Sequence, residues 1–249
     1  MSAVFREDTS IVFAEHEASW TREKVGRFWD SMSRRYGCEY FSEMVGDSLI
    51  GYVQSKVGGL DGLIMDFGCG PGFLLAKLAS RNIICEGVDF SKDSVDATAR
   101  RLDGIESFRG VAAVDGIPTH LEADRYSLVF FVETVEHLLE SDIAATIAEL
   151  NRILRPGGHV VITTPNREQL DEMSVTCPDC GCVFHRMQHM TSWTAASLSQ
   201  VSEQAGFETV IAVETMLYYQ KTRTRRFGAW LRQMILPTNP HLVYIGRKC

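Results

Sequence analysis

Long apolar runs are missing from this sequence. Its longest strongly apolar stretch covers residues 128–132, whereas a membrane-spanning helix needs about 20 such residues. The first ten residues include Arg6, Glu7 and Asp8, and no apolar segment follows them, so no secretory signal is visible. We therefore expect neither a transmembrane nor an exported protein, but a cytoplasmic one.

An excess of basic charge is also lacking. The 249 residues include 25 Lys and Arg against 32 Asp and Glu, which leaves a net charge of -7. Proteins that bind nucleic acids usually present a basic surface, so we expect no nucleic-acid partner. Hydrophobic residues make up 45% and charged residues 23% of the chain, which are ordinary globular values and exclude a mainly disordered protein.

The cysteines do not suit a disulfide scaffold. There are seven of them, an odd number, and disulfide bonds are rare in the reducing cytoplasm. Clustered cysteines are therefore interpreted first as metal ligands.

Short apolar segments alternate with helical segments along most of the chain. Strand-to-helix alternation requires right-handed crossovers, and these give a parallel sheet with helices on both faces. We therefore expect an α/β, Rossmann-like fold, with a helical N-terminal cap at 1–58, a main domain at 59–249 and an insert at 167–192. The pattern predicts helices within 17–57, 74–78, 93–102 and 143–154, and strands at 63–67, 83–88, 127–132, 159–163, 207–213 and 241–245.

A glycine loop joins the first of these strands to a helix. Gly68, Gly70 and Gly72 have G-x-G-x-G spacing, which differs from the G-x-G-x-x-G of dinucleotide sites and disfavours a nucleotide-sugar or NAD enzyme. Asp66 directly before the loop could attract a cationic ligand. Asp89 ends the next strand, where a carboxylate can accept both hydroxyls of a ribose. A ribose and a positive charge together point to S-adenosylmethionine.

With these residues in place, the sequence resembles the class I S-adenosylmethionine-dependent methyltransferases, in particular the small-molecule branch related to ubiquinone and menaquinone biosynthesis. The resemblance covers roughly residues 60–166. It implies a seven-stranded, mostly parallel sheet whose last strand is antiparallel. The four segments that carry it are Met65–Gly72, Gly87–Ser91, Tyr126–Val129 leading to Glu133–Leu138, and Leu154–Gly158 with Thr164–Asn166.

The resemblance also assigns the cofactor contacts. Asp89 would bind the ribose, Phe90 would flank the adenine, and Val114 and Asp115 would meet the adenine edge. The family's usual Gly-Asp-Ala is absent there, so its carboxylate is missing or displaced to Asp115. The other predicted cofactor residues are Asp66, Gly68, Cys69, Gly70 and Gly72, along the methionine part, and Val132.

Methyl transfer mainly requires alignment of donor and acceptor, and an oxygen acceptor also benefits from a general base. His137 is our first candidate, because it follows a strand at the carboxyl edge of the sheet, where such folds bind ligands. Glu133 is the second. Alternatively, Glu136 and His137 cap the following helix or hold a loop.

The insert contains a C-x2-C pair and an H-x3-H pair. Cys177, Cys180, His185 and His189 form a complete ligand set for a structural, tetrahedral zinc ion. Free cysteines beside exposed histidines, or a redox-active cysteine pair, are the alternatives. The histidines could also face the substrate instead of a metal.

A basic, amphipathic segment follows at 221–236. Such a helix can lie on an anionic membrane, or it can pack on its own domain with a solvated basic face. For the whole chain we expect methyl transfer to a hydroxyl oxygen of a small molecule. Transfer to nitrogen or carbon, and a catalytically silent cofactor-binding scaffold, are the alternatives. The sequence leaves the acceptor and the oligomeric state open.

Overall fold

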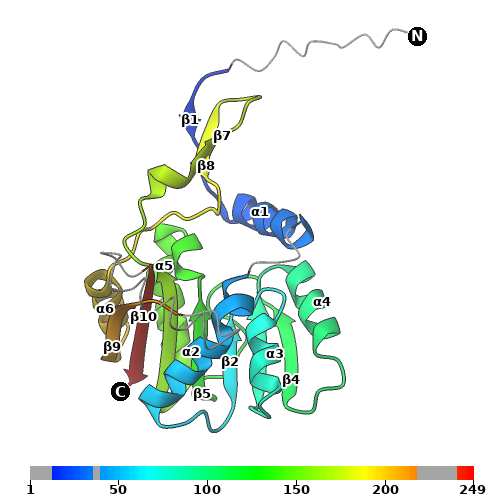
Figure 1. The fold of residues 1–249 in the computed structure, drawn as a ribbon, viewed down its shortest axis with the longest axis vertical. Helices are drawn as coiled ribbons and strands as arrows, with labels where there is room; N and C mark the ends of the chain where they lie inside the picture. The colour runs from blue at the N-terminus through cyan, green and yellow to red at the C-terminus, as the bar shows by residue number, and fades with distance from the viewer. Residues whose placement is uncertain (1–12, 36–39, 218–239) are drawn as a thin grey trace, which may run out of the picture.

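The computed structural model describes residues 13–35, 40–217 and 240–249. Its centre is a seven-stranded sheet with the strand order β4-β3-β2-β5-β6-β10-β9 (Figure 1). The strands are β2 (Ile64–Phe67), β3 (Cys85–Asp89), β4 (Phe108–Ala113), β5 (Tyr126–Val132), β6 (Leu154–Pro165), β9 (Phe207–Thr215) and β10 (His241–Lys248). Neighbours from β4 to β6 pair in parallel, and β10 is antiparallel to both β6 and β9. This topology confirms the predicted Rossmann-like sheet.

Helices cover both faces of this sheet. They are α2 (Phe41–Val57), α3 (Phe73–Ala79), α4 (Lys92–Arg101), α5 (Glu140–Ile153) and α6 (Ala195–Gln204). Adjacent strand residues point to opposite faces: Phe130 belongs to the core cluster with α2 and α3, while Phe131 belongs to the cluster with α5 and α6. Burial on both faces explains why the central strands are mostly apolar.

Helix α2 belongs to this core, although it lies within the segment predicted as a cap. Its residues Leu49, Ile50 and Val53 are fully buried against the sheet. The helix ends at Gly58, whose left-handed backbone lets its N–H donate to the Gln54 carbonyl. Helix α1 (Arg22–Arg35) lies beyond the carboxyl ends of the parallel strands (Figure 1).

The insert folds into a small sheet with the N-terminal segment. After the 3-10 turn η2 (Leu170–Met173), β7 (Ser174–Thr176) and β8 (Cys182–His185) form an antiparallel hairpin, and β1 (His16–Glu17) pairs in parallel with β8. Gly181 permits this approach: its φ is +77°, and a Cβ there would lie 2.4 Å from the Ala14 carbonyl oxygen. Figure 1 shows the hairpin projecting beyond α1.

The basic segment 221–236, considered above for membrane contact, lies outside the described residues. Within the ranges that the structure describes, no helix is both long and apolar enough to cross a membrane.

Candidate active site

The glycine loop connects β2 to α3. Gly68, Gly70 and Gly72 all have positive φ, at 79°, 51° and 78°, a region that favours glycine. A Cβ on Gly72 would lie 2.7 Å from the Thr98 side chain, and one on Gly68 would lie 3.0 Å from Thr134. Backbone conformation and close packing therefore both require the G-x-G-x-G spacing.

Asp89 is fixed at the end of β3. The backbone N–H of Gly70 donates to Oδ2 and that of Ser91 donates to Oδ1, both at 2.8 Å. Burial raises the pKa of Asp89 to about 6, while these N–H groups favour the ionised form. Asp89 is thus an oriented carboxylate that is mostly ionised at neutral pH.

Asp66 has a different environment. Its side chain is only 2% exposed, and burial, together with the nearby Asp89, raises its pKa to about 8. The carboxyl group of Asp66 is therefore mostly protonated at neutral pH. It does not line the main cavity, which lies at the carboxyl ends of the strands.

A cavity of about 980 Å³ lies at the carboxyl ends of β2, β3 and β5 and extends beneath α1. Its volume is at the upper end of the range for small-molecule sites. Trp29 and Met32 from α1, with Phe41 and Met44 from α2, supply apolar walls. The predicted site residues that line it are Gly68, Cys69, Gly70, Asp89, Phe90, Val114, Asp115, Val132, Glu133, His137 and His189; Gly72, Cys177, Cys180 and His185 do not.

His137 ends the 3-10 turn η1 (Val135–His137) after β5. Its Nδ1 lies 3.5 Å from the carbonyl oxygen of Gln188, to which it can donate in one of the two tautomers of the neutral ring. The ring also contacts Trp29 at 4.6 Å between centroids. Burial, with the neighbouring His189, lowers the pKa of His137 to about 3, so the imidazole is neutral.

Glu133 stands at a strained position, with a φ of +47°. Its Oε1 accepts a hydrogen bond from Thr163 Oγ1 at 2.8 Å. Burial raises the pKa of Glu133 to about 7, so this carboxyl can exchange a proton near neutral pH.

Two further carboxylates that sequence reasoning did not select lie beside the histidines. Glu168 Oε2 lies 2.5 Å from His189 Nδ1, and Glu168 Oε1 lies 3.4 Å from His185 Nε2. Glu136 Oε1 lies 3.9 Å from His137 Nε2. The His189 ring is 4.4 Å from that of His185 and 4.8 Å from that of His137. These five titratable groups therefore form one cluster, of which Glu136, His137 and His189 line the cavity.

The four predicted zinc ligands do not come together. Cys177 and Cys180 lie in the turn between β7 and β8, where the N–H groups of Cys180 and Asp179 lower the pKa of the Cys177 thiol. His185 lies at the far end of β8, and its extended backbone separates the two pairs. Within the described part of the chain, neither cysteine belongs to a group of three or more close metal-ligating side chains.

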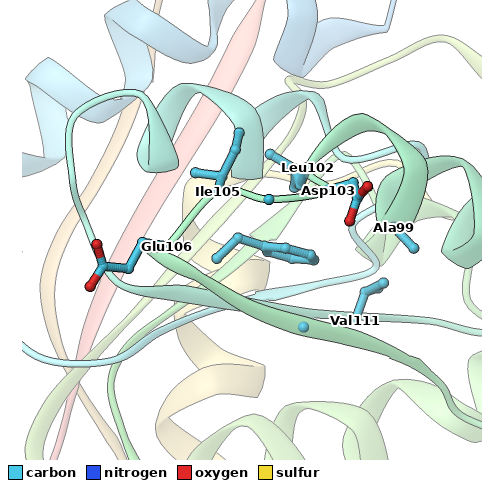
Figure 2. Close-up of a pocket in the computed structure, with 9 residues that line it drawn as sticks. Ala99, Leu102, Asp103, Ile105, Glu106 and Val111 are labelled. Atoms are coloured by element: carbon cyan, nitrogen blue, oxygen red, sulfur yellow. The ribbon is translucent and has the colours of Figure 1, made fainter.

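A second hollow, of about 550 Å³, lies beside β4, which is an edge strand of the main sheet. It is formed where α4 ends and β4 begins, and Figure 2 shows Asp103 and Glu106 at its rim with Leu102, Ile105 and Val111. None of the predicted site residues lines this hollow.

Comparison with known proteins agrees with the fold and the loop. A family model described as a methyltransferase domain matches residues 53–212. The chain belongs to the methyltransferase domain family. Together with the sheet order and the glycine loop, this match makes it a class I S-adenosylmethionine-dependent methyltransferase.

Curated relatives of this methyltransferase carry the name ubiquinone biosynthesis O-methyltransferase. The one from Alkalilimnicola ehrlichii is 28% identical over 159 residues, which cover 61% of this chain and 60% of that protein. The one from Serratia proteamaculans is 30% identical over 122 residues, covering 47% and 49%. The chain thus matches about half to three fifths of the length of these relatives.

Solved structures share the fold at low identity. The [4+2]-cyclase SpnF superimposes with a TM-score of 0.67 at 17% identity, covering 94% of this chain and 99% of that chain. Phosphoethanolamine N-methyltransferase 2 of Haemonchus contortus, solved with S-adenosyl-L-methionine, has a TM-score of 0.59 at 14% identity, covering 81% and 52%. The same fold therefore occurs in a protein named as a cyclase and in one named as an N-methyltransferase.

Proposed function

We propose that this methyltransferase transfers the methyl group of S-adenosylmethionine to a hydroxyl oxygen of a small molecule. One observation carries the proposal: a single cavity has the glycine loop and Asp89 in one wall and the neutral imidazole of His137 in another. The names of the curated relatives, which contain the term O-methyltransferase, also support oxygen as the acceptor atom.

The residues of the first wall fit the cofactor. Gly68 and Gly70 have no side chain between the backbone and the cavity, so a ligand can approach the loop closely. Each Asp89 oxygen accepts one backbone N–H, and a carboxylate has about four acceptor sites, so capacity remains for two ribose hydroxyls. Phe90 is 48% exposed at the cavity and offers its ring for stacking on the adenine.

The other wall suits an acceptor. When bound, S-adenosylmethionine supplies a methyl group on a positively charged sulfur. The imidazole of His137 is neutral because burial lowers its pKa to about 3, so it can accept a hydrogen bond from the acceptor hydroxyl. Such a low pKa makes it a weak base, and Glu133, with a pKa of about 7, is the second proton acceptor at the cavity. Trp29 and Met32 make this region apolar and favour an acceptor with an apolar body. His137 would therefore orient the hydroxyl and, together with Glu133, assist the loss of its proton, while these walls hold the acceptor in line.

The test compares wild type, His137→Ala and the exposed-histidine control His120→Ala. Each protein is incubated with S-adenosylmethionine and a panel of phenols, aliphatic alcohols and amines, and S-adenosylhomocysteine is measured. We expect turnover with hydroxyl acceptors, a loss of about 10²–10⁴-fold only in His137→Ala, and equal cofactor affinity in all three proteins. Turnover with amines alone would make the acceptor atom wrong. Cofactor binding without turnover on any acceptor would favour a silent scaffold.

A further inference from the structure

Two arginines border the cavity, and they differ in what they contact. Arg22 of α1 forms two hydrogen bonds with the Asp142 carboxylate, at 2.9 and 2.7 Å. Arg186, which directly follows β8, is exposed. Within the ranges that the structure describes, the Arg186 side chain has neither a hydrogen bond nor an ion pair. One of the two guanidinium groups is therefore matched by the protein, and the other is available to a ligand.

The backbone that carries Arg186 is held on both sides. Its own N–H donates to the Met173 carbonyl at 2.9 Å. In the turn that follows, the N–H groups of Met187, at 3.3 Å, and His189, at 3.1 Å, both donate to Nδ1 of the buried His185 ring. A side chain on a fixed backbone loses less conformational freedom when it binds a ligand. This placement therefore favours recognition of a ligand over the role of an ordinary surface arginine.

The acidic groups of the acceptor wall do not cancel the charge of Arg186. Burial raises the pKa of Glu133 to about 7 and that of Glu136 well above its usual value, so at neutral pH the first is about half protonated and the second is mostly protonated. Although burial opposes ionisation, the hydrogen bond from His189 lowers the pKa of Glu168, and this carboxylate is thus already paired. The acceptor wall consequently has little free negative charge that would repel an anion.

A guanidinium group binds carboxylates and phosphates particularly well, because its planar fork can donate two parallel hydrogen bonds to their oxygens. The same cavity has apolar walls that include Trp29, Met32 and Met187, and it has the neutral imidazole of His137. A ligand that matches all of these features has an apolar body, a hydroxyl group and, apart from that hydroxyl, an anionic group.

We propose that the methyl acceptor carries a carboxylate or a phosphate in addition to its reacting hydroxyl, and that Arg186 binds this anionic group. The inference rests on the proposed function and names its class of substrate. In the reaction, the hydroxyl oxygen bonds to the methyl carbon, the carbon–sulfur bond breaks, and its electron pair stays on sulfur as a neutral thioether, while the hydroxyl proton passes through the cavity to solvent. The anionic group is unchanged, so Arg186 determines which acceptor binds and takes no part in the chemistry.

Pairs of acceptors that differ in charge test this inference. Para-hydroxyphenyl-alkanoic acids of increasing chain length are compared with their methyl esters, and para-hydroxyphenyl-alkyl phosphates with the parent alcohols. Calorimetric titration in the presence of S-adenosylhomocysteine measures binding, and kcat/KM is measured separately with S-adenosylmethionine. We expect at least one acid or phosphate to bind wild type about tenfold more tightly than its neutral partner, as for a hydrogen bond to a charged group. The absence of such a preference in every pair would overturn the proposal.

Variants identify the group that binds the anion. Arg186→Gln should lose the preference for the charged partner and keep its affinity for the neutral partner and for S-adenosylmethionine, which also shows that it folds. Arg186→Lys should retain part of the preference, because it keeps the charge but not the planar fork. The matched control is Arg167→Gln, which should behave as wild type. Arg167 is exposed and donates to Glu214, and it does not border the cavity.

Two other results would overturn the assignment of Arg186. A preference for charged acceptors that persists in Arg186→Gln would mean that another group binds the anion. Weaker binding of S-adenosylmethionine in Arg186→Gln would mean that this guanidinium contacts the carboxylate of the cofactor instead. The proposed function fails in a different way: charged acceptors that bind wild type but not Arg186→Gln, without turnover of any hydroxyl compound, would support the anion site and refute methyl transfer to oxygen.

Discussion

Asp89 shows how one side chain can combine two tasks. It accepts N–H groups from Gly70 and Ser91, so it holds the glycine loop in place, and it also faces the cavity. We expect Asp89→Asn to weaken S-adenosylmethionine binding about 10–100-fold, since hydrogen bonds to a charged group contribute about 1.5–3 kcal/mol. Calorimetric titration measures this change. Asp103→Asn, at the hollow of Figure 2, is the control, and an unaltered affinity in Asp89→Asn would refute the ribose assignment.

The same residue predicts a pH dependence. Its pKa is raised to about 6, so protonation below pH 6 removes the charged acceptor. Affinity for S-adenosylmethionine should therefore be constant from pH 7 to 8 and fall by up to tenfold per pH unit below about 6. Titrations between pH 5 and 8 check this, and the slope should be absent in Asp89→Asn. An affinity in wild type that does not change down to pH 5 would contradict the role of the carboxylate.

At the scale of elements, Gly181 allows the N-terminal strand β1 to pair closely with β8 of the insert. A side chain there would collide with the Ala14 carbonyl at 2.4 Å, and φ is +77°. Gly181→Ala should thus separate β1 from β8 and raise amide hydrogen exchange at residues 16–18 and 182–183. Exchange in β5 should stay slow, because that strand is buried in the main sheet. Mass spectrometry of peptides resolves the two regions; slow exchange throughout would mean that the pairing survives.

The elements also show what the sequence could predict. Buried strands such as β5 are mostly apolar, and the glycine spacing identified the loop that follows β2. The edge strand β4 is only half buried, so its apolar pattern is weak. In the insert, a turn after β8 brings the rings of His185 and His189 together. Glu168 lies 17 positions before His185 in the sequence, and no local pattern signals that contact.

At the scale of the whole molecule, buried carboxyl groups couple stability to pH. The folded pKa of Asp66 is about 8, against about 3.9 when unfolded. Between these values the folded state holds a proton that the unfolded state has released. The group's stabilising contribution, complete below pH 4, is therefore lost as pH rises to 8, by about 1.4 kcal/mol per pH unit.

Asp66→Asn should remove this slope. We expect the free energy of unfolding of wild type to fall more steeply from pH 6 to 8 than that of the variant, with similar slopes above pH 9. Urea denaturation at each pH without cofactor measures the difference. Parallel curves from pH 6 to 8 would show that Asp66 is already ionised in the folded protein.

The side chain of Gln188 connects helix α1 to the turn η1 across the cavity. Gln188 is fully buried; its amide oxygen accepts from Trp29 Nε1 at 2.8 Å, and its Nε2 donates to the His137 carbonyl at 3.0 Å. Arg22 adds a bond from α1 to Asp142 on α5, and Asp30 accepts one from Ser91. Movement of α1 away from the cavity would therefore require several of these contacts to break together. In an enzyme whose cycle is limited by such a movement and not by chemistry, acceptors of very different intrinsic reactivity are methylated at similar maximal rates.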